Sequence, residues 1–142
     1  MNDIRIIQGR YVRPDTAMAL RLAGYKPGPA WDKAMDMCQS LIQTVRRSIQ
    51  AKAALAFVQL PAGKERLYVI LTLGPVVSRQ EQLYFRDGRE VEGILFSSLA
   101  DSCIFAFEQE LLPQIRRICQ EKGLGIAQRH EAGIDVPLSV QS

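Results

Sequence analysis

The sequence has little of what most enzymes use for catalysis. Histidine occurs once, as His130. There is no P-loop, no G-x-G-x-x-G, no G-x-S-x-G, and no cluster with the spacing of a metal site. A lone histidine needs partners to act as a base or a metal ligand, so we interpret His130 as an exposed loop residue. The sequence predicts no catalytic residue and no metal site.

Cysteine is also scarce. The three cysteines, Cys38, Cys103 and Cys119, form no C-x-x-C pair and lie in apolar helical stretches. They are therefore interpreted as reduced core thiols. The first residues lack the basic-then-apolar order of a signal peptide, and no apolar run reaches the roughly 20 residues that span a bilayer. We expect a cytoplasmic protein with no membrane contact.

Neither basic nor acidic residues are concentrated in one part of the sequence. The 142 residues include 18 basic and 15 acidic ones, a net charge of +3. The pairs Arg46–Arg47 and Arg116–Arg117 are interpreted as solvated helix faces, since no aromatic residues are interleaved with them to stack on bases. Nucleic acid is therefore not predicted as a partner. With 47% hydrophobic residues, the chain is expected to form one domain over residues 1–142.

Two helices are predicted near the N-terminus. Pro14 and Asp15 are typical of a helix start, and Gly24 of its end. In the next helix, apolar residues recur at steps of three and four from Trp31 to Ile49, and polar residues fill the opposite face.

Two short apolar runs follow, "AALAFVQL" and "RLYVILTL", separated by the turn-like "PAGKE". They predict an antiparallel hairpin of two strands. Ser78 and Glu81 then have the spacing of a capping box, which predicts a helix from Ser78 to about Arg86.

The stretch from Glu90 to Gly123 is helical in composition, and Pro113 predicts either a bend or a restart within it. Its first half has apolar residues on more than one face and is expected to be buried against the sheet. Residues 124–129, "LGIAQR", predict a short strand. The fold class is therefore α/β or α+β, with a small, mainly antiparallel sheet flanked by helices.

Asp101 is the one acid inside the apolar part of that long helix. A carboxylate there must be exposed, paired or protonated. It is either a structural acid, bonded to a neighbouring amide or hydroxyl, or part of a site. Asp101 is also the only feature that favours an enzyme of unrelated chemistry.

Four segments together resemble the activation domain of cobalamin-dependent methionine synthase and its free-standing bacterial relatives. The first three are "ALRLAGY" (residues 19–25), "YVILTLGPVV" (68–77) and "SLADSCIFAFEQEL" (98–111). The fourth is the terminal pattern from Arg129 to Gln141, "RHEAGIDVPLSVQ". The order and spacing of the four are more specific than any one of them, and they extend from near the start of the chain to its end.

The resemblance implies a C-shaped domain with a twisted antiparallel sheet and flanking helices. It implies binding of S-adenosylmethionine beside a corrinoid protein or methyltransferase that carries cobalamin. An electron from a flavodoxin-type donor and the methyl group of S-adenosylmethionine then restore methylcobalamin from the inactive oxidised state. The protein would at most be part of a cobalamin-dependent methyltransferase system.

The same resemblance assigns cofactor-binding positions to Arg129, Glu131, Gly133 and Ile134. A guanidinium can hold the carboxylate of the ligand with two parallel hydrogen bonds, and glycine lets backbone amides approach it. The sequence departs from the family pattern at Ala132, where proline is usual, and at Ile134, where a tyrosine is expected. Loss of the aromatic ring removes a favourable contact with the sulfonium, which predicts weaker binding or none.

The chain also ends soon after this loop, so we expect a short version of the family that lacks its C-terminal segment. The exposed edge would then be covered by a second copy, giving a homodimer, or by the corrinoid protein. A protein interaction module that has lost the S-adenosylmethionine site is the alternative function.

Overall fold

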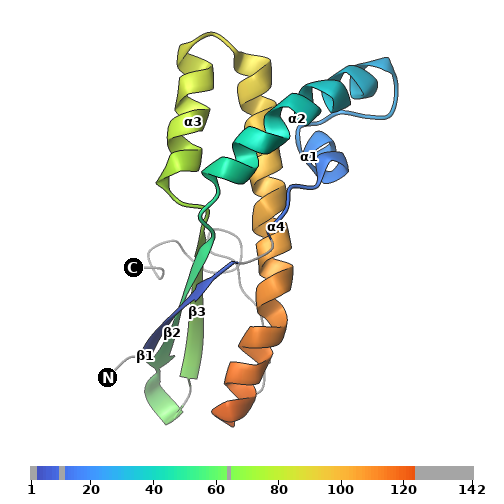
Figure 1. Cartoon of the computed structure of the whole chain (residues 1–142). Coiled ribbons are helices and arrows are strands. Elements are labelled where there is room, and N and C mark those ends of the chain that lie inside the picture. The colour runs from blue at the N-terminus through green and yellow to red at the C-terminus, as the bar shows by residue number, and fades with distance from the viewer. Residues whose placement is uncertain (1–2, 10–11, 64, 124–142) are drawn as a thin grey trace. The chain divides into compact units, whose positions relative to one another are not determined.

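The computed structural model describes residues 3–9, 12–63 and 65–123. The chain divides into two compact units, residues 1–110 and residues 111–142. The first unit contains the sheet, three complete helices and the larger part of a fourth helix (Figure 1). The described part of the second unit is the remainder of that fourth helix and the residues up to Gly123. The predicted strand over residues 124–129 lies outside the described residues.

The described residues form a mixed α+β fold with one antiparallel sheet of three strands and four α-helices. The strands are β1 (Asp3–Gln8), β2 (Lys52–Gln59) and β3 (Glu65–Thr72), and β2 lies between the other two. The predicted hairpin is therefore confirmed, with a short 3-10 turn at Pro61–Gly63. Because every neighbouring pair is antiparallel, the fold class is α+β and not α/β.

Strand β1 was not predicted from the sequence. It alternates Ile4 and Ile6 with Arg5, a period of two that is typical of a strand, but the run is too short to stand out. Its register places Ile4 opposite Ala56 and Ile6 opposite Ala54. Pairing with β2 extends the predicted hairpin to a sheet of three strands, the size at which a sheet becomes independently stable.

The predicted first helix is confirmed as α1 (Thr16–Leu22). The Asp15 side chain accepts a hydrogen bond from the amide of Met18 at 3.0 Å, which satisfies a free amide of the first turn. The amide of Asp15 in turn donates to Ser102 Oγ at 2.9 Å, which ties the start of α1 to the last helix. The predicted second helix is confirmed as α2 (Pro29–Ser48), with Pro29 in its first turn.

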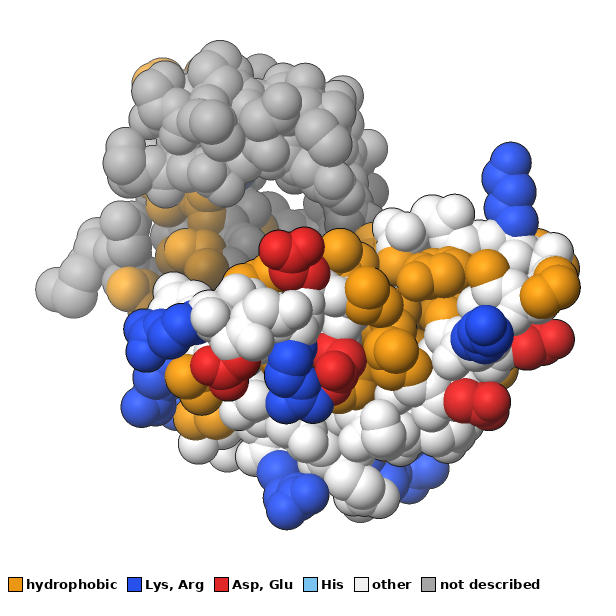
Figure 2. Space-filling model, turned by 90° about the horizontal axis from the view of Figure 1, so that it is seen from above, with side chains coloured by type: hydrophobic (Ala, Val, Ile, Leu, Met, Phe, Trp, Pro, Cys, Tyr) orange, Lys and Arg blue, Asp and Glu red, His pale blue; other side chains and the backbone are white. Residues whose placement is uncertain are grey.

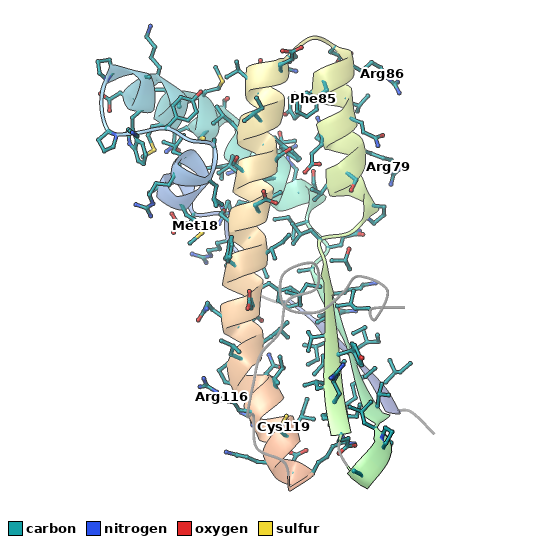
Figure 3. All side chains as sticks on the ribbon, turned by 180° about the vertical axis from the view of Figure 1, so that it is seen from behind. Met18, Arg79, Phe85, Arg86, Arg116 and Cys119 are labelled. Atoms are coloured by element: carbon teal, nitrogen blue, oxygen red, sulfur yellow. The ribbon has the colours of Figure 1, made fainter. Side chains whose placement is uncertain are left out.

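Helix α3 (Pro75–Arg86) begins three residues before the predicted start. The capping box was wrong, because Ser78 lies inside the helix. Gly74 occupies the N-cap with φ +92°, a conformation that favours glycine, and no side chain caps the helix there. The end of α3 at Arg86 is as predicted. Arg79 and Arg86 project away from the helix pair, whereas Phe85 lies on the side that faces the last helix (Figure 3).

The last helix, α4 (Glu90–Glu121), is continuous through Pro113, so it is one helix and not two. Pro113 cannot donate to the carbonyl of Gln109, four residues earlier, and the boundary between the two compact units lies close to this missing bond. Near its start, Gly93 lies against the Phe85 ring, because a Cβ atom at Gly93 would lie 3.0 Å from it. Glycine therefore leaves room for the Phe85 ring beside the start of α4.

The core of the first unit contains buried residues of α1, α2, β2, α3 and α4. Tyr84 of α3 and Phe96 of α4 place their ring centroids 5.4 Å apart. The buried side chains of α4 in this unit include Leu95, Phe96, Leu99, Cys103 and Phe107. The expectation of burial for the first half of α4 is confirmed for these residues and wrong for Val91 and Ile94, which are about half exposed. In the second unit, Leu111 and Cys119 are buried and Arg116 is exposed.

Candidate functional site

The predicted S-adenosylmethionine site lies outside the described residues. It comprises Arg129, Glu131, Gly133 and Ile134, all beyond Gly123. These assignments stay predictions. The described part of the chain nevertheless contains three of the four segments that carry the resemblance.

Two of these segments, 19–25 and 98–111, contribute apolar residues to the core. Segment 19–25 forms most of α1 and buries Ala19 and Leu20. Segment 98–111 buries Leu99 and Phe107, and its Ser102 hydroxyl accepts the hydrogen bond that fixes the start of α1. These two segments therefore have a structural role, in the core and in the bond that ties the start of α1 to α4.

Asp101 is exposed on α4, which is one of the three states expected for a carboxylate in this apolar stretch. Partial removal from water still raises the pKa of its carboxyl. Burial also raises the pKa of Glu81 on α3, the negative charge of Asp101 raises it further, and a hydrogen bond from Ser97 lowers it. Asp101 of α4 and Glu81 of α3 thus form an acidic pair between two helices.

The cysteines are free thiols, as predicted, and all three are buried. Burial raises the pKa of Cys103 to about 12, against the smaller lowering by its bond with Ser102. Burial also raises the pKa of Cys38. Since the thiolate is the reactive form, these two residues are packing residues and not nucleophiles.

Two further findings concern metal binding and membrane-spanning helices. Within residues 3–9, 12–63 and 65–123, no three His, Cys, Asp or Glu residues are placed to hold a metal ion. Over the same described ranges, none of the helices is both long and apolar enough to cross a membrane.

A basic cleft of about 560 Å³ lies where β1, α2 and β2 come together. We call it the basic cleft and define it by its lining residues: Gln8, Gly9, Val12, Arg13, Arg46, Ile49, Gln50, Ala51 and Lys52. Two backbone hydrogen bonds hold its walls in place. The amide of Gly9 donates to the carbonyl of Ala51 at 2.9 Å, and the amide of Gln50 donates to the carbonyl of Leu73 at 2.7 Å. The cleft is therefore anchored to the sheet.

The cleft combines cations with an apolar wall. Arg13, Arg46 and Lys52 are exposed, and none of the described lining residues is acidic. Val12, Ile49 and Ala51 contribute apolar surface. No sequence pattern indicates this grouping, because Arg13, Arg46 and Lys52 are separated by 33 and 6 positions. Arg46 had been interpreted only as part of a solvated helix face.

A small apolar hollow of about 300 Å³ lies between the end of α1 and the start of α4. It is lined by Ala23, Gly24, Tyr25, Val91 and Ile94. Hydrophobic side chains also gather in a band between charged ones on the face of the molecule seen from above (Figure 2). The hollow offers packing surface but, apart from the Tyr25 hydroxyl, no side chain with hydrogen-bonding chemistry.

The sheet has an apolar outer face, which we define by Ile4, Ile6, Ala54, Ala56, Val58, Tyr68 and Ile70. The register places these side chains on one side of the sheet. Ile4, Ile6 and Ile70 are 64%, 63% and 65% exposed. Lys52 ends this face on one side and Arg66 on the other, and the register places no acidic residue between them. The outer face is therefore an apolar surface bounded by cations.

Comparisons of this chain with protein-family models, with curated proteins and with solved structures found no match.

Proposed function

We propose that the protein is an accessory that docks on a corrinoid protein and takes part in the reductive remethylation of its cobalamin, like the methionine synthase activation domain that it resembles. The observation that carries the docking role is the outer face of the sheet, where three isoleucines are each more than 60% exposed. Contiguous apolar surface of this kind marks an interaction site. The α+β architecture, with its antiparallel sheet and flanking helices, is compatible with an activation-domain-like fold.

The charges at the two ends of the outer face favour one kind of occupant. Lys52 and Arg66 are both exposed there. A partner with an apolar patch and an acidic rim would satisfy both the apolar centre and the cations. The outer face of a second copy would present the same cations, Lys52 and Arg66, and no acidic residue between them to pair with those of the first copy. We therefore assign the outer face to the corrinoid protein, and the homodimer stays a prediction that light scattering can check.

Remethylation is tested by spectroscopy of the corrinoid partner. The cobalamin-carrying domain, in its inactive oxidised state, is mixed with a flavodoxin-type donor and S-adenosylmethionine. We expect the absorbance spectrum to convert to that of methylcobalamin only when this protein is added. The donor supplies the electron that reduces the cobalt. The reduced cobalt then takes the methyl group from the sulfonium of S-adenosylmethionine, which becomes a thioether. Conversion at the same rate without the protein would contradict the proposal.

The second candidate is an interaction module without a ligand, favoured by Ala132 and Ile134, which depart from the family pattern. Calorimetric titration of S-adenosylmethionine into the wild type and Arg129→Ala separates the two. Binding that is lost in Arg129→Ala supports presentation of the methyl donor by Arg129. Absence of heat from the wild type at millimolar ligand supports the docking module alone.

A further inference from the structure

We infer that the basic cleft binds a small phosphorylated ligand of about nucleotide size, an activity beyond the function proposed above, although Lys52 lies both in the cleft and at the end of the outer face. Its volume of about 560 Å³ falls within the range of roughly 300–1,000 Å³ that small-molecule sites occupy. Its chemistry sets the ligand class, because three cations converge on a cavity whose described lining contains no carboxylate.

The cations of the cleft are available to a ligand. No side-chain hydrogen bond or ion pair joins Arg13, Arg46 or Lys52 to any other described residue. The same is true of the side chains of Gln8 and Gln50, which supply carboxamide donors at the same cleft. Guanidinium groups match phosphate oxygens with paired hydrogen bonds, and lysine adds a point charge.

The apolar wall of the cleft would contact the part of the ligand that carries no phosphate. Val12, Ile49 and Ala51 form an apolar surface beside the cations. A phosphorylated molecule with an apolar or aromatic body, such as a nucleotide, would place its phosphates on the cations and its body on this wall. The cleft does not suit S-adenosylmethionine, because the sulfonium and ammonium groups of that molecule would meet three cations and no carboxylate among the described lining residues.

Helix α2 also offers an internal control. Arg46 and Arg47 both lie in its last turn, where each positive charge interacts favourably with the negative end of the helix dipole. Only Arg46 lines the cleft, whereas Arg47 bonds to the carbonyl of Gln43. Substitution of either residue removes the same charge from the same turn, so a difference between the two variants reports on the cleft.

The test is an amide-resolved NMR titration of the full chain, at constant ionic strength, with ATP, inorganic pyrophosphate and adenosine. We expect saturable shifts at Gly9, Ala51 and Lys52 with the two phosphates and none with adenosine. If ATP binds more tightly than pyrophosphate, the nucleoside contacts the apolar wall. If the two bind equally, the cleft recognises the phosphates alone. Both results support the site.

Arg46→Gln should weaken ATP binding by about tenfold or more, the effect of losing a charge-assisted bond, while Arg47→Gln keeps wild-type affinity. Two outcomes would overturn the inference: equal weakening in both variants, or no saturable shift with either phosphate at millimolar concentration. Neither outcome bears on docking by the outer face or on the S-adenosylmethionine titration, so failure of this site and failure of the proposed function are distinguishable.

Discussion

The two faces of the sheet differ in exposure far more than in apolar content. On the inner face, Ala53, Leu55 and Phe57 of β2 are buried in the core. On the outer face, Ile4, Ile6 and Ile70 extend into solvent from the flanking strands, on either side of a central row of alanines. Apolar residues on the inner face are explained by folding, since they remove apolar surface from water. Folding does not explain the exposed apolar residues of the outer face, and we propose that they contact a partner.

The largest effect should separate the two faces directly. Leu55→Ala leaves a cavity under a fully buried side chain, and should lower the free energy of unfolding by about 2–5 kcal/mol. Ile6→Thr on the outer face keeps a β-branched side chain and should change it by less than about 0.5 kcal/mol. Urea unfolding of both variants measures this. Similar losses in the two variants would mean that the outer face also belongs to the core.

A smaller effect concerns the residue that follows β1. A Cβ atom at Gly9 would lie 2.8 Å from Val12 Cγ2 and 2.9 Å from Ala51 Cβ, and 3.1 Å from the ring of Phe107. Gly9→Ala should therefore destabilise the protein by about 1–3 kcal/mol through overpacking. The inner side of the sheet has no space for even one methyl group there.

Gly93→Ala is the matched control for this close packing. The added methyl would meet only the ring of Phe85, a side chain that is half exposed and can turn away. The gain in helix propensity, of about 1 kcal/mol, offsets the crowding. The same unfolding experiment should show little change or a small stabilisation, and a loss as large as that of Gly9→Ala would contradict this account of the packing.

The smallest expected effect is on pH dependence. The pKa values of Asp101 and Glu81 are both raised, so the folded protein holds these protons more tightly than the unfolded chain. Their contribution to stability is complete below the ordinary carboxyl pKa, and is lost as pH rises through the raised pKa of the folded state. Asp101→Asn removes one acid and the charge that acts on the other.

Thermal unfolding from pH 4 to pH 7 should therefore show a smaller loss of stability in Asp101→Asn than in the wild type. Asp36→Asn, on the exposed face of α2, leaves the pair intact and should retain the wild-type slope. A steeper loss in Asp101→Asn would mean that the Asp101 carboxylate stabilises the folded protein.

The sequence predicted the elements better than the surfaces. Periodicity identified α2 and the hairpin because each pattern is long and local. It missed β1, whose apolar run is short. It also misplaced the start of α3, because Gly74 at the N-cap and Pro75 at the first helical position outweigh a capping box at Ser78. The alternation in β2 indicates two faces but not which one is buried. The basic cleft could not be predicted, since its cations converge only when β1 and β2 pair beside α2.

The most direct test of docking is the binding of the purified cobalamin-carrying domain of a methionine synthase to the immobilised protein, measured by interferometry. Wild type is compared with Ile70→Asp on the outer face and with Leu83→Asp, which changes a leucine of α3 that is 44% exposed and lies outside this face. We predict saturable binding that Ile70→Asp abolishes and Leu83→Asp preserves. Binding that is absent from the wild type, or equally strong in Ile70→Asp, would contradict docking of a corrinoid protein by the outer face.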